Sequence, residues 1–503
     1  MSKTLLSKAM TLLSLVLLVS VLHAQANDAT ANPTQQPGTS KVRIVRLSMV
    51  KGAVEINRDG TRGFEKAIAN LPVVEKNQIR TGMGVAEVEF EDNSSLRLTP
   101  NTEVEFPELD RTAAGATASS VHVIQGTVYV SLMKPENSKA PVNEFTLQFG
   151  NRKVTLEPAS HLRLDVEGAT SKLAVLDGSV QVDGAGGAMN VAKKKTVTFT
   201  MLSPDEPKIA GGVDKSEFDG WDHDATSYHS KAASVMASRS PYAFGSQYAY
   251  GLSDMMYYGN FTSGCGGGMM WRPYFTTAAW DPFANGTWAW YPGAGYSWVS
   301  PYPWAWTPFH YGSWGYCPDL GWGWMPGGSW NGVNNVAALI PKGSSGTTGG
   351  GFGRRLPPPH PPQPHQPTMV AVSTKPLQAS VGSTTAFEFR KDSAGLGVPR
   401  GTLGRLDKFS HETATHGVAR TSVYVSAPTS SHVEGRSSMA SSLGASVHRG
   451  SPPSSSSSSS NSWNAPSSSS MGSGGGGGAV GGGGRSVAPA PAPAPAPSGG
   501  PRK

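Results

Sequence analysis

Cysteine, charge and long apolar runs are all scarce in this chain. Cys265 and Cys317 are the only cysteines in 503 residues, so the sequence excludes a cysteine-rich scaffold and a Cys-x-x-Cys redox or zinc pattern. In an oxidising compartment the two could form one disulfide and close a loop of 52 residues. Two unpaired buried thiols are the alternative.

The first apolar run is too short to cross a membrane. It extends from Met10 to Leu22, about 13 residues, whereas a spanning helix needs roughly 20. Lys3 and Lys8 precede it, and the small-residue sequence 24–26 follows. Residues 1–26 therefore read as a secretory signal peptide, with an uncleaved anchor as the alternative. We expect an exported protein, periplasmic, at the cell surface or secreted, with no transmembrane span after cleavage.

Charged residues make up only 15% of the chain, and the net charge differs between its regions. The net charge is +7, but residues 341–503 hold 15 Lys and Arg against 5 Asp and Glu. That segment thus carries +10, and the remainder carries −3. The cations are scattered singly, whereas nucleic-acid sites usually cluster them. We therefore expect no nucleic-acid partner.

After a polar linker at 27–40, short runs alternate between apolar and polar residues. Val50–Ile56 alternates and ends in a turn at 57–60, and the pattern recurs at Val85–Phe90. Further candidate strands are Leu96–Leu98, Val104–Phe106, His122–Ile124, Thr127–Val130, Phe145–Phe149, Val154–Leu156, Leu162–Val166, Leu173–Leu176 and Val180–Val182. Such alternation predicts strands with one buried and one wet face. Residues 41–202 should form a β domain, of solenoid or sandwich type.

Several of these runs resemble the FecR domain. The sequence Leu71–Gly82 ends in Ile-Arg-Thr-Gly, and Asp92–Thr102 carries an acidic-polar turn, Leu-x-Leu and Pro-Asn-Thr. Gln125–Val128 and Leu176–Val180 resemble the recurrent Gly-x-Val turns of that family. The resemblance implies a stack of short strands outside the inner membrane. The best-known members transmit a signal through a cytoplasmic anti-sigma region, and no such region precedes this domain, so transcriptional regulation is not carried over.

A stretch with helical spacing follows the predicted β domain. Phe218, Trp221, Tyr228 and Val235 lie near the intervals of a single helix face. We interpret residues 216–240 as a short helical connector that packs on a neighbouring module.

Tryptophan is concentrated in one region. Eleven of the thirteen tryptophans lie between Trp271 and Trp330, and residues 280–298 match 306–324 at eight of nineteen positions. An incomplete copy precedes these two. Residues 254–330 therefore form a module of three imperfect repeats. Because aromatic and small residues alternate, each unit is predicted to be a short hairpin with a tryptophan face.

Those tryptophan faces allow two interpretations. Exposed indole rings could stack on sugar rings, or the indoles could be the core of a module that is poor in aliphatic residues. The candidate stacking residues are Trp280, Trp288, Trp290, Trp306, Trp314, Trp322 and Trp324. The stretch also resembles an uncharacterised Trp/Tyr/Pro/Gly repeat domain found behind FecR domains in exported bacterial proteins, a resemblance that implies no activity.

Beyond residue 341 the sequence becomes low in complexity. Ser454–Ser460, Gly474–Gly478 and the Ala-Pro alternation of 488–497 cannot bury enough apolar surface to fold. Residues 341–503 are therefore expected to be a disordered Gly/Ser/Pro-rich tail. The less repetitive stretch Phe387–Phe409 is a candidate for docking elsewhere.

No catalytic motif is present, so we predict a protein that is not an enzyme, with no catalytic residues, cofactor or metal. The overall expectation is a mainly β chain: a FecR-type domain, a short helical connector, a small aromatic-rich β module and a disordered tail. The first functional hypothesis is a noncatalytic envelope protein that binds or scaffolds peptidoglycan or another envelope glycan. The alternative is an envelope sensor or signalling component whose FecR-like domain docks a protein partner, and an unrecognised hydrolase ranks third.

Overall fold

The structure is a computed structural model that describes residues 42–58, 63–112, 115–134, 143–184, 187–200, 207–238, 250–341, 370–371 and 386–422. These residues all belong to one compact unit, 1–434. The predicted signal peptide at 1–26 and linker at 27–40 lie outside the described residues. Within the described ranges, no helix is long and apolar enough to span a membrane. The chain is mainly β, as predicted.

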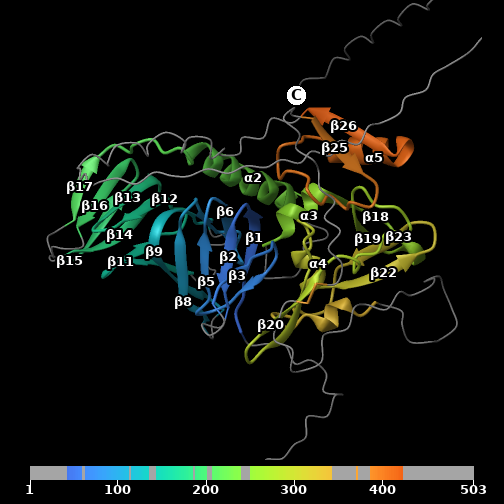
Figure 1. The fold of residues 1–503 in the computed structure, drawn as a ribbon, viewed down its shortest axis with the longest axis horizontal. Helices are drawn as coiled ribbons and strands as arrows, with labels where there is room; N and C mark the ends of the chain where they lie inside the picture. Colours follow the sequence, from blue (N-terminus) through green and yellow to red (C-terminus); the bar gives the residue numbers. More distant parts are fainter. Residues whose placement is uncertain are drawn as a thin grey trace, which may run out of the picture. The chain divides into compact units, whose positions relative to one another are not determined.

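Two sheets that share one long strand, β9 (Thr117–Ser131), form a sandwich (Figure 1). The first sheet is antiparallel throughout, in the order β4 (Pro72–Val73), β1 (Val45–Lys51), β6 (Val85–Glu89), β7 (Ser95–Leu98), β9, β12 (His161–Glu167), β13 (Thr170–Asp177), β16 (Lys195–Thr200) and β17 (Lys208–Gly211).

The second sheet has the order β3 (Glu65–Lys66), β2 (Val54–Asn57), β5 (Gln78–Thr81), β8 (Glu103–Arg111), β9, β10 (Glu144–Phe149), β11 (Arg152–Leu156), β14 (Ser179–Gly184) and β15 (Gly187–Ala192). Only the β9–β10 pair in it is parallel. Of the two predicted architectures, the structure has the sandwich.

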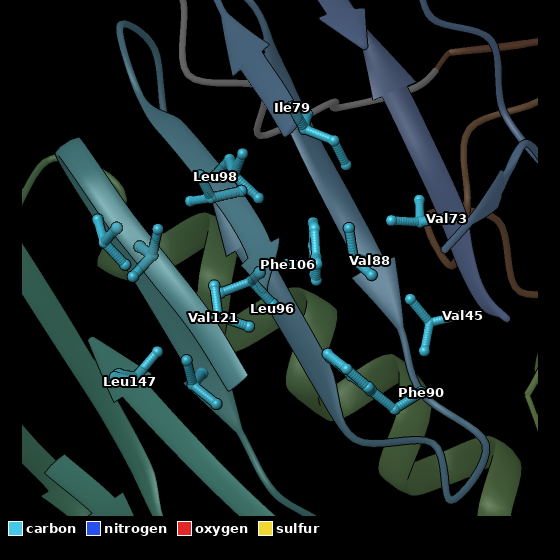
Figure 2. Packing of buried hydrophobic residues seen from close by; sticks show 14 of the residues in the cluster. Val45, Val73, Ile79, Val88, Phe90, Leu96, Leu98, Phe106, Val121 and Leu147 are labelled. Carbon is cyan, nitrogen blue, oxygen red and sulfur yellow. The ribbon is translucent and has the colours of Figure 1, made fainter. Parts of the chain in front are cut away.

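An aliphatic core fills the space between the two sheets. Alternate residues of each strand point inward, because side chains of a strand alternate between its faces. Figure 2 shows Val88, Leu96 and Leu98 of the first sheet near Phe106 and Val121 of the second. All five side chains are fully buried. The sandwich therefore has a hydrophobic core of its own, made mostly of Val, Leu and Ile.

Two strand predictions were wrong at glycines. Val50–Ile56 is not one strand: β1 ends at Lys51 and β2 begins at Val54, because Gly52 turns the chain with a φ of +76°. Conversely, His122–Ile124 and Thr127–Val130 both belong to β9. Gly126, with a φ of +91°, lies where β9 passes from the second sheet to the first. A Cβ at Gly126 would lie 2.5 Å from the Cα of Thr102, so only glycine fits this crossing.

Two helices follow the sandwich. The helix α2 (Asp219–Ser238) occupies the predicted connector, and α3 (Leu252–Tyr258) begins the aromatic module. The Tyr228 hydroxyl on α2 donates to Asp254 Oδ1 on α3 at 2.8 Å, so the two helices are in direct contact.

Three hairpins build the aromatic module, and they confirm the predicted repeat. They are β18–β19 (Gly259–Ser263 with Met269–Pro273), β20–β21 (Thr287–Tyr291 with Gly295–Val299) and β22–β23 (Ser313–Cys317 with Gly321–Met325). Each hairpin places an aromatic pair directly across the strands: Phe261 with Trp271, Trp288 with Trp298, and Trp314 with Trp324. The register therefore repeats along with the sequence.

Shorter elements complete the module. The 3-10 turn η2 (Cys265–Gly267) lies in the first hairpin, the helix α4 (Trp306–His310) precedes the third, and the 3-10 turn η3 (Val336–Leu339) follows it. Strand β23 also pairs with β19, which joins the first and third hairpins into one sheet.

The predicted disordered tail at 341–503 is interrupted by folded segments. The two-residue strand β24 (Val370–Ala371) pairs with β20. Residues 386–422 form β25 (Ala386–Arg390), the helix α5 (Leu406–His416) and β26 (Val418–Ser422). Phe387 and Phe389 are buried, and the Phe389 ring stacks on Phe275 at 4.9 Å. The prediction of disorder was thus wrong for 386–422, because this segment supplies aromatic residues to the module's core.

Candidate functional site: a buried charge cluster beside an aromatic module

A set of buried charged side chains, here called the charge cluster, joins the sandwich to the helices and to the C-terminal segment. Its members are Arg46 on β1, Glu87 and Glu89 on β6, Arg97 on β7, Asp222 and His229 on α2, Asp254 on α3, and Arg400 between β25 and α5. Every side chain is at most 3% exposed except that of Arg400, at 14%. The cluster is therefore shielded from solvent.

Arg97 binds the sandwich to α2. Its Nε donates to Glu87 Oε2 at 2.9 Å, and its Nη1 donates to Asp222 Oδ1 at 2.7 Å. Glu87 and Arg97 are also direct cross-strand partners of β6 and β7. The other oxygen of Asp222 lies 2.7 Å from Nε2 of His161, which is 20% exposed and forms the rim of the cluster. The guanidinium thus fixes the helix over the polar face of the sheet.

Arg46 binds the sandwich to the aromatic module. Nη1 donates to Glu89 at 2.8 Å, and Nη2 lies 2.8 Å from Asp254 Oδ2 and donates to the Pro303 carbonyl at 2.6 Å. Nε donates to Asn70, whose own amide donates to the carbonyls of Ser300 and Tyr302. The loop at 300–303 is therefore held by side chains of the sandwich.

Arg400 brings the C-terminal segment into the same cluster. Its guanidinium contacts Glu87 at 2.5 Å and Asp254 at 2.8 Å, and it also donates to the Ser48 carbonyl. The Tyr228 ring lies beneath it, with the guanidinium carbon 5.3 Å from the ring centroid. Three segments far apart in sequence thus meet at two carboxylates.

Burial and neighbouring charges oppose each other at these groups. Burial alone would raise the pKa of Glu87, yet His229, Arg400 and Arg97 hold it well below its usual range. The pKa of Asp254 is lowered in the same way, against its burial, by Arg400 and Arg46. Both carboxyls are therefore ionised in the folded protein at neutral pH. Removing one partner from such a pair leaves an uncompensated buried charge, which typically costs about 3–5 kcal/mol.

The expectation of a wet face was wrong at β6 and β7. Both strands are buried on both faces, because α2, α3 and Arg400 cover the polar side. Alternation alone does not tell what covers a strand. The opposite charges of Glu87 and Arg97 at facing positions are the one signal in the sequence that could have indicated a paired, buried face.

The structure places six of the seven candidate stacking tryptophans in the interior. Trp280, Trp288, Trp306, Trp314, Trp322 and Trp324 are 0–4% exposed, and Trp290 alone is half-buried. Their rings pack on one another: Trp280, for example, meets Trp314 with centroids 6.1 Å apart. The alternation of aromatic and small residues thus builds a core, and these six rings do not form an exposed platform.

Glycines make room for that core at the same point of each repeat. A Cβ at Gly259 would lie 2.4 Å from the Trp271 ring, and one at Gly286 would lie 2.2 Å from the Trp298 ring. At Gly312 it would lie 2.5 Å from Nε1 of Trp324. In all three hairpins the tryptophan of the second strand therefore covers a glycine that precedes the first strand's aromatic by two residues.

The two cysteines are paired. Cys265 and Cys317 form a disulfide with their Cα atoms 5.7 Å apart, linking the turn of the first hairpin to β22 of the third. The bond closes the loop of 52 residues that the sequence spacing sets.

His310 is a buried histidine within the aromatic core. It is 1% exposed, its Nδ1 donates to the Trp306 carbonyl at 2.8 Å, and its ring stacks on Trp330 with centroids 5.3 Å apart. Burial lowers the pKa of His310 to about 4. The imidazole is thus neutral in the folded protein at neutral pH.

The candidate site shows no metal-binding arrangement. Among the residues that the structure describes, no group of three or more His, Cys, Asp or Glu side chains is arranged to hold a metal ion. The carboxylates of the cluster are instead engaged by guanidinium and imidazole groups.

Comparisons with known families match both folded regions. Residues 77–181 match the FecR protein family, and residues 252–339 match DUF6600, a family of unknown function. The chain therefore contains a FecR domain in its sandwich and a DUF6600 domain in its aromatic module. The FecR match includes Glu87, Glu89 and Arg97, and the DUF6600 match includes Asp254, so the charge cluster lies where the two domains meet.

Comparisons with curated proteins and with solved structures give no close relative. A search of curated proteins gives no significant match. The chain resembles two crystal structures, at 1.65 and 2.50 Å resolution, of a protein described as an anti-sigma factor from Parabacteroides distasonis, each with 16% identity. The match covers 29% of this chain and 63% of the other, with TM-scores of 0.24 and 0.23. Similarity this low supports no argument about fold or partner.

Proposed function

We propose that this chain is a noncatalytic component of the bacterial cell envelope that acts in sensing or signalling through contacts with another protein. The FecR match at 77–181 carries the proposal. In this view the protein is exported by residues 1–26 and works outside the inner membrane. The FecR and DUF6600 domains act as one unit, since Arg46 and Arg400 each bridge a glutamate of β6 and Asp254.

The burial of the tryptophans supports a protein partner over a glycan. A sugar ring stacks on an aromatic face that water can reach, and six of the seven candidate rings have none. The sandwich, in contrast, has exposed apolar side chains at Met83 (54%), Ile124 (39%) and Ile209 (39%). Exposed apolar side chains are common on any protein, so these three are starting points for mapping contacts rather than a defined patch.

Photo-crosslinking in intact cells tests the proposal. A photoreactive amino acid would replace Met83, Ile124 or Ile209, and Val418 in the C-terminal hairpin, 36% exposed, would serve as the control position. The proposal expects a discrete protein adduct from at least one sandwich position and none from the control. In parallel, tryptophan fluorescence of the purified protein would be titrated with peptidoglycan fragments. A saturable fluorescence change without any protein adduct would contradict the proposal and favour the glycan hypothesis.

A further inference from the structure

The segment 386–422, here called the latch, is attached to the aromatic module differently from the module's own hairpins. Among the described residues, its strands β25 and β26 pair only with each other, whereas β19 and β23 join two hairpins into one sheet. The disulfide between Cys265 and Cys317 lies within the module and does not include the latch. The DUF6600 match ends at residue 339, before the latch begins. The latch is therefore held mainly by side-chain contacts.

Side chains of the module bind the backbone of the latch. Three hydrogen-bond donors each bind a latch carbonyl: Trp304 Nε1 that of Ala394 at 2.7 Å, the Tyr258 hydroxyl that of Val398 at 2.8 Å, and the Tyr257 hydroxyl that of Leu403 at 3.1 Å. Every peptide carries such carbonyl groups. These contacts therefore favour an ordered peptide backbone on this surface without selecting its sequence.

Two side chains of the latch add specificity. The Phe389 ring stacks on Phe275, with centroids 4.9 Å apart and planes at 6°. Asp392 accepts hydrogen bonds from the backbone N–H and the hydroxyl of Thr277, at 2.7 and 2.8 Å. A ligand of this surface therefore carries an aromatic ring and a carboxylate at these two positions.

Arg400 connects the latch to the junction between the two domains. It bridges Glu87 of the FecR domain and Asp254 of the DUF6600 domain. Its side chain is 14% exposed, whereas the other side chains of the charge cluster are at most 3% exposed. Without the latch both carboxylates would lose this cation, while Arg46 would still bridge Glu89 and Asp254. The junction would then be weakened and not abolished.

The latch is too small to keep its fold alone. It falls below the roughly 40 residues under which domains usually need a disulfide, a metal or association with another chain. An isolated two-stranded hairpin is also only marginally stable. The buried side chains of Phe387, Phe389, Leu403 and Leu406 belong to the same cluster as the rings of the module. Because these contacts are what order the latch, we expect it to leave the module as one unit.

We propose that the aromatic module carries a docking surface for a separate peptide segment and that the latch is its ligand, bound within the same chain. The docking surface consists of Tyr257, Tyr258, Phe275, Thr277 and Trp304. It alternates between an occupied and an open state, and because Arg400 leaves with the latch, opening also weakens the contact between the FecR and DUF6600 domains. The latch is an intramolecular contact, so it does not depend on the envelope partner proposed above.

Binding of a synthetic peptide to the full chain tests the proposal. A fluorescent peptide of residues 386–422 would be titrated with the wild-type chain and with Arg400→Gln, and its anisotropy would be measured. The wild type should bind weakly, because its own latch competes at a high effective concentration. Arg400→Gln loosens that latch, so the wild-type peptide should bind this chain on the order of tenfold more tightly. A peptide that itself carries Arg400→Gln should lose this gain.

Arg420→Gln is the matched control, since this exposed arginine of the same segment pairs with Glu388 at the surface. In the chain or in the peptide it should leave binding unchanged. No saturable binding to either chain, equal affinity for the wild type and Arg400→Gln, or an equal gain in Arg420→Gln would overturn the proposal. If Arg400→Gln does not fold, hydrogen exchange in the wild type decides. Joint exchange of β25 and α5 while hairpins β20–β21 and β22–β23 stay protected supports the latch, and exchange of all of them together refutes it.

Discussion

The FecR sandwich and the aromatic module bury their interiors with different side chains. In the sandwich, Val, Leu and Ile from two large sheets interdigitate, and long strand pairing fixes their register. In the module, strands of five residues leave little room for that solution, and the core consists of Trp, Tyr and Phe. Each indole buries a large area and carries a donor. Short hairpins can therefore share one core if glycines allow the rings to approach the backbone.

The boundary between these two regions is built in a third way. At β6 and β7 the sandwich presents carboxylates and a guanidinium, which pair with the opposite charges of Arg400 and of Asp222 on α2. Buried ion pairs add little net stability compared with apolar contacts, but they strongly penalise any arrangement in which one partner is missing. The comparison suggests that apolar cores stabilise each region and that the charge cluster specifies how the regions join.

The largest effect is expected from breaking that junction. Arg97→Met should destabilise the protein by about 3–5 kcal/mol, because Glu87 and Asp222 would both lose the buried guanidinium that lies between them. Lys193→Met is the matched control, since its pair with Asp177 is exposed by 61% and 66% and should contribute at most about 1 kcal/mol. Urea unfolding of both variants measures the difference. Equal effects would mean that the buried pairs act like surface pairs.

The stability of the aromatic core should depend on pH through His310. Folding lowers the pKa of His310 from 6.5 to about 4, so between these values the unfolded chain binds a proton that the folded one does not. Stability should therefore fall as pH falls through this window, by about 3 kcal/mol in all. His310→Phe keeps a ring between Trp306 and Trp330 and should lose this part of the acid sensitivity. Urea unfolding at several pH values, wild type against variant, checks it; parallel curves would contradict the assignment.

Replacing a glycine that lies against a tryptophan ring should cause a smaller loss of stability. Gly286→Ala should destabilise the module by about 1–3 kcal/mol, since the new methyl group would meet the Trp298 ring at 2.2 Å. Gly268→Ala is the control: a Cβ there meets nothing within 4 Å, and its backbone is extended. Thermal unfolding followed by tryptophan fluorescence compares the two. A neutral Gly286→Ala would show that the ring moves aside freely.

The smallest predicted effect separates the contribution of the indole N–H hydrogen bond to stability from the contribution of the buried ring area. Trp304 donates to the Ala394 carbonyl at 2.7 Å, whereas Nε1 of the equally buried Trp298 has no partner in the described part of the chain. Trp304→Phe should therefore cost about 1 kcal/mol more than Trp298→Phe, the net value of one hydrogen bond. Urea unfolding of the two variants gives the comparison. A larger loss of stability in Trp298→Phe would indicate that ring packing, and not the hydrogen bond, determines the difference between the two variants.

Much of the fold could be predicted from the sequence because it is locally periodic. Alternation in Val85–Phe90 and Leu96–Leu98 located β6 and β7, and the 26-residue repeat located hairpins β20–β21 and β22–β23. Predictions failed where one glycine changed the course of the chain, as at Gly52 and Gly126. A turn or a crossing depends on one residue, so it has no period to detect.

The charge cluster could not be predicted because its members are remote in sequence. Asp254 meets Arg46 and Arg400 only in the folded chain, and Arg400 lies in a segment whose composition resembles a disordered tail. Trp288 and Trp314 illustrate the opposite difficulty. Their spacing indicates a shared face, but burial of that face depends on what the other hairpins and residues 386–422 place over it.

The most direct test of the role of the charge cluster is whether the two domains unfold together. Urea unfolding would be followed by tryptophan fluorescence, which reports on the module because eleven of the thirteen tryptophans lie between Trp271 and Trp330, and by far-UV circular dichroism, to which the sandwich strands contribute most. We expect coincident transitions in the wild type and separate ones in Arg46→Met, which loses the bridge between Glu89 and Asp254. Separate transitions already in the wild type would contradict this expectation, because the charge cluster would then not join the FecR and DUF6600 domains into one unit.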